Sequence, residues 1–154
     1  MIKILFVCHG NICRSPMAEF IMKDLVSKNG AEDLFYIESA ATSCEELGNP
    51  VYGPARRKLA EHGLSCEGKR ARRITKGDYS KFDLLIGMDE ENLYNMRREF
   101  SGDPERKVKL LLSYAGLDRD VDDPWYTRDF ESAWQDIKMG CESLFFFLSN
   151  KKRE

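Results

Sequence analysis

The sequence contains little histidine and no closely spaced pair of cysteines. Only 2 of its 154 residues are histidine, and its 5 cysteines include no C-x-x-C motif. An odd number of scattered cysteines favours neither a disulfide scaffold nor a zinc site. We therefore expect no metal, no other cofactor and a reducing compartment, the cytoplasm.

Long hydrophobic runs and a large net charge are also missing. The apolar runs at residues 2–7 and 144–148 are too short for a signal peptide or a membrane-spanning helix. The formal net charge is -2, which gives no electrostatic reason to expect nucleic acid or a membrane as a partner. With 42% hydrophobic and 32% charged residues and no linker, we expect one domain over residues 1–154, and a monomer.

Strand and helix patterns alternate along the chain. Apolar, β-rich segments predict four strands, at residues 2–7, 35–39, 83–88 and 108–112. Helical spacing of apolar residues, with caps and stop signals, predicts helices at about residues 16–28, 54–62, 90–100 and 130–150. This alternation predicts an α/β fold, a single three-layer domain in which helices cover both faces of a parallel sheet.

Two of the remaining segments carry charge. Residues 66–75 are basic, and we expect them to form a solvated face; their cations are Lys69, Arg70, Arg72 and Arg73. Residues 118–129 are expected to form an acidic loop. Loops at the carboxyl ends of parallel strands share one edge of the sheet. The acidic loop, the loop after the first strand and the loop at Ser39 are therefore expected to border one cleft.

The loop after the first strand has the chemistry of an anion site. Five residues separate Cys8 from Arg14, about enough for the backbone to wrap a tetrahedral anion with its N–H groups pointing inward. Arg14 would donate two hydrogen bonds to the anion, and such an electropositive loop favours the nucleophilic thiolate of Cys8. The sequence thus indicates a cysteine that attacks a phosphate ester. The alternative is a buried structural cysteine, with Arg14 in solvent.

A proton donor for the leaving group is expected in the acidic loop. Asp123 precedes Pro124, which confines the backbone of Asp123 to extended geometry. Asp122 is an open alternative. Trp125 and Tyr126 would provide a wall against which an aromatic leaving group stacks. Without the cysteine loop, the same segment would be interpreted as an exposed acidic turn with packed aromatic residues.

Together these motifs resemble the low-molecular-weight protein tyrosine phosphatases, over essentially the whole chain. The resemblance is carried by residues 7–16, 39–42, 48–50, 82–89 with Asn92, and 123–124. The Asp-Pro pair follows the cysteine loop, whereas the acid precedes that loop in the larger tyrosine phosphatases. The resemblance implies a four-stranded parallel sheet of order 2-1-3-4.

The resemblance also implies roles for individual residues. Cys8 would be the nucleophile, Arg14 would bind the phosphoryl oxygens, and Asp123 would be the general acid. Ser15 would stabilise the thiolate, while Asn11 and Ser39 would hold the loop in shape. The backbone cradle for the phosphate would consist of His9, Gly10, Asn11, Ile12, Cys13, Arg14 and Ser15.

Residues 48–52 look more like the bacterial members of the family, and four positions depart from the family pattern. Ala41 stands where many relatives have glycine. Glu45 stands where an aromatic residue is common, Trp125 replaces the first of two tyrosines, and Gly68 stands where a histidine often supports the loop. We expect Glu45, Trp125 and Tyr126 to form the cleft wall, and the support at Gly68 to be absent or filled by water. Glu45 is expected to disfavour strongly acidic phosphopeptides.

The expected reaction is metal-independent hydrolysis of phosphotyrosine on a protein, or of a small aryl phosphate, through a cysteinyl-phosphate. Three alternatives compete with it. Protein arginine phosphatases of this fold carry threonine at the position of Ile12. Arsenate reductases of this fold use a later pair of cysteines, whereas Cys44, Cys66 and Cys141 are isolated. The third alternative is a non-catalytic phosphate-binding module. Such a module needs neither a nucleophile nor an acid, so the presence of Cys8, Arg14 and Asp123 together argues against it.

Cys13 leads to a redox hypothesis. A sulfenic acid on Cys8 would condense with the Cys13 thiol to form a reversible disulfide, which protects the nucleophile from further oxidation. The alternative is that Cys13 is a small packing residue.

Overall fold

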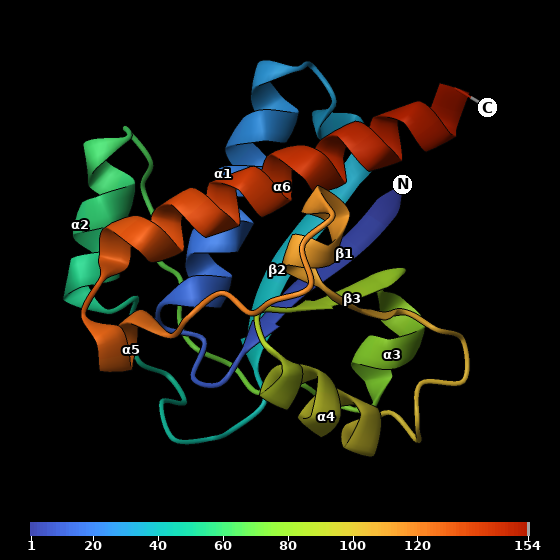
Figure 1. Ribbon diagram of the computed structural model, residues 1–154, viewed down its shortest axis with the longest axis horizontal. Helices are drawn as coiled ribbons and strands as arrows, with labels where there is room; N and C mark the ends of the chain where they lie inside the picture. The colour runs from blue at the N-terminus through green and yellow to red at the C-terminus, as the bar shows by residue number, and fades with distance from the viewer. Residues whose placement is uncertain (154) are drawn as a thin grey trace.

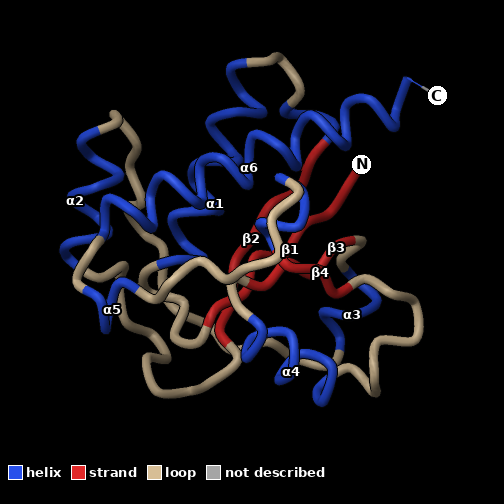
Figure 2. The backbone as a smooth tube through the Cα atoms, viewed as in Figure 1, coloured by secondary structure: helices blue, strands red, loops and turns tan. Residues whose placement is uncertain are grey.

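A parallel sheet of four strands forms the centre of the molecule (Figures 1 and 2). The computed structural model describes residues 1–153 and the side chains of residues 1–151. The strands, in the spatial order β2-β1-β3-β4, are β1 (Ile2–Cys8), β2 (Phe35–Ala41), β3 (Leu84–Gly87) and β4 (Val108–Leu110). The predicted α/β fold and its strand order are confirmed.

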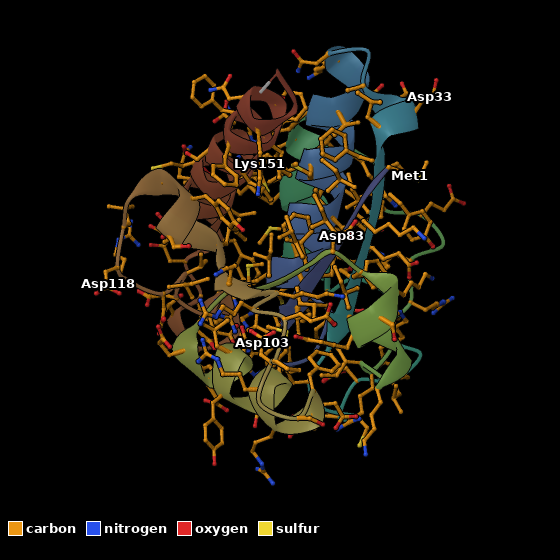
Figure 3. All side chains as sticks on the ribbon, turned by 90° about the vertical axis from the view of Figure 1, so that its right-hand side faces the viewer. Met1, Asp33, Asp83, Asp103, Asp118 and Lys151 are labelled. Atoms are coloured by element: carbon orange, nitrogen blue, oxygen red, sulfur yellow. The ribbon has the colours of Figure 1, made fainter. Side chains whose placement is uncertain are left out.

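Helices cover both faces of this sheet (Figure 1). One face carries α1 (Arg14–Lys28), α2 (Gly53–Glu61) and α6 (Phe130–Arg153), and the other carries α3 (Gly77–Lys81) and α4 (Glu90–Glu99). α1 and α6 pack against each other. In the rotated view of Figure 3, Lys151 near the end of α6 lies in the upper half and Asp103, after α4, in the lower half.

The side chains of β1 alternate between two hydrophobic cores. Ile4 and Phe6 pack in the core beneath α1 and α6, whereas Leu5 and Val7 pack in the core beneath α4. All four are fully buried. A strand with apolar side chains on both faces is what a parallel sheet covered on both sides requires. This burial fixes the position at which the chain leaves the sheet, at Cys8.

β1 and β3 end within one residue of the prediction, whereas β2 and β4 each end two residues away from it. β4 stops at Leu110, and a 3-10 turn, η2 (Leu111–Ala115), follows and ends at Gly116 with a φ of 75°. Leu111 and Leu112 are buried, but in contact with the α6 side of the core, and an apolar run does not by itself distinguish these arrangements. β2 instead continues past Ser39 to Ala41, because Ala41 pairs with Cys8.

The predicted acidic loop contains a helix, α5 (Pro124–Thr127), and two further short elements are α3 and η1 (Glu32–Leu34). None of the three was predicted, because three to five residues are too few to show a helical repeat. Asp123 caps α5 by accepting a hydrogen bond from the Trp125 N–H at 3.1 Å. The cap therefore fixes the Asp123 side chain as well as the helix.

The apolar stripe of α6 faces the core. Trp134, Ile137, Cys141 and Leu144 are buried, whereas Phe146 is 68% exposed. Within residues 1–153, none of the helices combines the length and the hydrophobicity needed to cross a bilayer.

Gly140 allows α6 to pack closely on η2. A methyl group at this position would lie 2.6 Å from the Cγ atom of Leu111. We expect Gly140→Ala to lower the free energy of unfolding by about 1–3 kcal/mol, because the steric overlap outweighs the better helix propensity of alanine. Urea denaturation measures this change. Gly77→Ala is the matched control, since its methyl group would meet no atom closer than 3.7 Å; an equal loss in both variants would contradict the packing argument.

Candidate active site

Cys8 lies at the end of β1, where the chain turns into a buried loop. Its Sγ atom accepts a hydrogen bond from the Asn11 N–H at 3.3 Å and lies 3.0 Å from Oγ of Ser15. The loop leads directly into α1, which begins at Arg14. The unpaired N–H groups and the partial positive charge of a helix amino end therefore lie beside the sulfur.

Asn11 gives the loop its curvature. Its φ of 58° is in the left-handed region, which asparagine tolerates better than most residues. The side-chain amide of Asn11 donates to Oγ of Ser15 at 2.8 Å and to Oγ of Ser39 at 2.9 Å, and its Oδ1 accepts from the Arg72 N–H at 3.2 Å. Asn11, Ser15 and Ser39 are almost completely buried. The structure thus places all three predicted support residues behind the loop.

A buried ion pair supports this network from below. Oγ of Ser39 donates to Glu19 at 2.5 Å, and the Lys69 ammonium donates to the carbonyl oxygen of Ser39 at 2.9 Å while lying 3.5 Å from Glu19. Lys23 also donates to Glu19, at 2.6 Å. Burial lowers the pKa of Lys69, and the charge of Glu19 opposes that shift.

Two expectations about this region are wrong. The basic segment is not only a solvated face, because Lys69 points inward and Arg72 pairs with Asp78 at 3.0 Å. The second wrong expectation is that the support of the loop near Gly68 is absent or filled by water. Instead, the neighbouring Lys69 binds both Ser39 and Glu19. Glu19 was missed, although its spacing of one helical turn after Ser15 on α1 was a usable signal.

Arg14 is a buried cation that gathers groups from two other segments. One terminal nitrogen donates to Asp89 and to the carbonyl oxygen of Val121, both at 2.8 Å, and the other lies 3.4 Å from Asp123. Burial opposes the charge of Arg14, but the charges of Cys8, Asp123 and Asp89 outweigh it, so that its pKa is raised. Asp89 also caps α4, because its side chain accepts a hydrogen bond from the N–H of Asn92 in the first turn of that helix.

The structure separates the two candidate acids. Asp123 borders the same cavity as Cys8, whereas Asp122 is exposed and lines a different hollow. α5, which Asp123 caps, lies at the same end of the molecule as the loop between β1 and α1 (Figure 1). The geometry therefore favours Asp123, the residue fixed by Pro124, as the proton donor.

A cavity of about 100 Å³ opens above Cys8. Its lining contains the predicted nucleophile, anion ligand, acid and wall together with Glu46, which was not predicted. The lining residues are Cys8, His9, Gly10, Ile12, Cys13, Arg14, Glu45, Glu46, Asp123, Trp125 and Tyr126. This volume suits a small anion and the start of its substituent rather than a large ligand. No group of three or more potential metal ligands occurs within the described residues.

Aromatic and charged side chains form the wall of this cavity. Trp125 packs against Tyr52 with ring centroids 4.8 Å apart, and Arg128 donates to the Tyr52 hydroxyl at 3.0 Å. On the other wall, Glu45 lies 3.0 Å from Nε2 of His9. The Glu45 carboxylate is thus paired with an imidazole.

Cys13 lines the cavity close to the nucleophile. Burial, followed by the charge of Cys8, raises the pKa of the Cys13 thiol. Cys13 is therefore a thiol at neutral pH, and its attack on a sulfenic acid would require the loss of that proton.

Comparison with known proteins agrees with this arrangement. The family model described as low molecular weight phosphotyrosine protein phosphatase matches residues 3–154. The chain belongs to this family. Low molecular weight protein-tyrosine-phosphatase YfkJ of Bacillus subtilis is 40% identical over 99% of both chains. The crystal structure of YfkJ matches with a TM-score of 0.96, over 99% of this chain and 97% of that one.

Relatives from animals extend the comparison. The low molecular weight phosphotyrosine protein phosphatase of Gallus gallus is 37% identical over 92% of both chains. The crystal structure of DARP, a Drosophila arginine phosphatase, is 34% identical, with a TM-score of 0.86 over 96% of this chain and 98% of that one. The family predicted from the sequence motifs is confirmed.

In this member of the low molecular weight family, we expect Lys69→Met to lower the free energy of unfolding by about 1–3 kcal/mol, because the Ser39 carbonyl oxygen loses its Lys69 donor and buried Glu19 also loses a charged partner. Denaturant unfolding monitored by Trp fluorescence measures the loss. Lys23→Met is the control: Lys23 is 45% exposed, and removing its ion pair should cost less than about 1 kcal/mol. An equal effect of both changes would contradict a special role for Lys69.

Proposed function

We propose that this chain hydrolyses phosphotyrosine on proteins through a cysteinyl-phosphate intermediate. One observation carries the proposal: a thiol, a buried guanidinium and a carboxylate line a single small cavity, with the positive end of a helix beside the thiol. The family to which the chain belongs supports the same conclusion. The proposed catalytic residues are Cys8, Arg14 and Asp123.

In the first step, Sγ of Cys8 attacks phosphorus, and the bond from phosphorus to the tyrosine oxygen breaks. The N–H groups of the loop and the Arg14 guanidinium hold the equatorial oxygens, where negative charge is spread in the transition state. Asp123 gives its proton to the leaving phenolate. Trp125 and Tyr126 provide the wall along which the departing ring lies.

In the second step, water attacks the cysteinyl-phosphate, and Asp123, now a carboxylate, accepts the proton of that water. The bond from sulfur to phosphorus breaks, and inorganic phosphate leaves. Cys8 returns as a thiolate, stabilised by the Asn11 N–H and the Ser15 hydroxyl. Because the loop and Arg14 supply the positive charge, we propose that the reaction needs no metal and no other cofactor.

Phosphoarginine is the second candidate substrate, and the structural similarity to the Drosophila arginine phosphatase motivates it. Ile12 favours phosphotyrosine, because it lines the cavity with an apolar side chain and offers no hydroxyl to orient a phosphoramidate. Arsenate reduction is disfavoured, since Cys44, Cys66 and Cys141 do not line the cavity. A protein with a reactive free thiol suits a reducing compartment, and we propose that it acts in the cytoplasm as a monomer.

The acid assignment can be tested with two aryl phosphates. We expect Asp123→Asn to lower kcat/KM for phenyl phosphate by about 10²–10⁴-fold, and to lower kcat/KM for p-nitrophenyl phosphate less, because kcat/KM reports the step in which the phenolate leaves and a good leaving group needs less protonation. Cys8→Ser should abolish hydrolysis of both. Asp122→Asn is the matched control and should have little effect; a larger effect at Asp122 would reverse the assignment.

The redox hypothesis for Cys13 is tested with hydrogen peroxide. Peroxide would oxidise Cys8 to a sulfenic acid, which would condense with the Cys13 thiol and release water, forming a disulfide. We expect dithiothreitol to restore activity after peroxide in the wild type and much less in Cys13→Ser. Peptide mapping should find the link between Cys8 and Cys13. Irreversible oxidation of wild-type Cys8 without that link would contradict the hypothesis.

A further inference from the structure

A second hollow, of about 350 Å³, adjoins the catalytic cavity. Its lining residues are His9, Thr42, Ser43, Arg73, Asn95, Arg98 and Glu99. His9 belongs to the lining of both hollows. A peptide whose phosphotyrosine entered the catalytic cavity would therefore have its neighbouring residues within reach of this second hollow.

The hollow has an excess of positive charge. Arg73 lies 3.3 Å from Glu99, so these two charges offset each other. Arg98 makes no ion pair with any carboxylate of the described chain, and its guanidinium lies over the exposed ring of Tyr94, 5.8 Å from the ring centroid. Arg98 is thus a cation available to a ligand. Thr42, Ser43 and Asn95 add hydrogen-bonding groups around it.

Backbone hydrogen bonds tie this hollow to the catalytic loop. The Thr42 N–H donates to the carbonyl oxygen of Cys8 at 3.0 Å, and the Ser43 N–H donates to that of His9 at 3.1 Å. The Ser43 hydroxyl also donates to the His9 carbonyl oxygen, at 2.9 Å. Thr42 and Ser43, which line the hollow, are therefore held at a fixed position relative to Cys8.

Charge differs between the two sides of His9. On the catalytic side the rim carries Glu45 and Glu46, and Glu45 is paired with the His9 imidazole. On the other side the unpaired charge is that of Arg98. An acidic side chain of a substrate would be repelled by the glutamate rim and attracted to the α4 side.

We propose that this second hollow, the basic subsite, binds the carboxylate of an acidic residue that flanks phosphotyrosine in the substrate. The inference rests on the proposed phosphotyrosine hydrolysis and names its substrate class: acidic phosphopeptides, oriented so that the acidic flank lies over α4. It refines the expectation from Glu45, because an acidic flank is disfavoured only on the side of the glutamate rim.

The experiment compares kcat/KM for three phosphotyrosine peptides. One carries two glutamates before the phosphotyrosine, one carries them after it, and one carries glutamines at all these positions. We expect the wild type to prefer one of the glutamate peptides over the glutamine peptide by about 2- to 5-fold, the effect of one partly exposed charge pair. The ratio between peptides is the readout, so a general change in activity cancels.

Arg98→Gln should bring this ratio close to 1, and Arg98→Glu should invert it. Arg97→Gln is the matched control, because Arg97 is exposed on the same helix and carries the same charge but lies outside the hollow; its ratio should equal that of the wild type. A wild-type ratio near 1, or an equal loss in the Arg97 and Arg98 variants, would overturn the basic subsite. Failure of the wild type to hydrolyse any of the three peptides would instead overturn the proposed function.

Discussion

The left-handed backbone of Asn11 determines the shape of the anion loop, and buried hydrogen bonds hold it there. The Asn11 side chain connects Ser15 on α1, Ser39 on β2 and the backbone of Arg72. Each of these groups would be costly to bury without a partner. The network is therefore satisfied in the folded arrangement that points the Asn11 N–H at the Cys8 sulfur, and these hydrogen bonds offset the backbone strain at Asn11.

Below this network lies the buried carboxylate of Glu19. Glu19 is 4% exposed, and a carboxylate at that depth requires cations and hydrogen-bond donors. Lys69, from the segment between α2 and α3, and Lys23, one turn further along α1, supply them. The consequence is that the basic segment is anchored to the proposed phosphate-binding loop.

Arg14 couples the anion site to the carboxyl ends of the other strands. Its partners Asp89 and Val121 follow β3 and β4, and Asp123 lies two residues after Val121. In a parallel sheet these strand ends meet at one edge. A single buried guanidinium thus draws together the nucleophile, the cap of α4 and the proposed acid. The basic subsite lies along the same edge, on the α4 side of His9.

The sequence by itself determined what is local. Cys8 to Arg14 is a continuous segment, and its spacing and flanking apolar runs predict an anion loop between a strand and a helix. The Asp123-Pro124 pair predicts a proton donor in this segment, with Asp122 as the alternative, and the alternation of strand and helix patterns predicts the α/β fold. The family and the strand order followed from the resemblance that these motifs carry.

Only the tertiary structure decided which distant side chains meet. It paired Lys69 with Glu19, gave Arg14 its partner Asp89, separated Asp123 from Asp122, and turned Leu111 and Leu112 away from β4 towards α6. The spacing of apolar residues predicts which face of a helix or strand is buried, but not which residue of another segment packs against that face. Ion pairs between buried charges depend on this packing, because a buried charge is unfavourable unless another segment brings a partner to it.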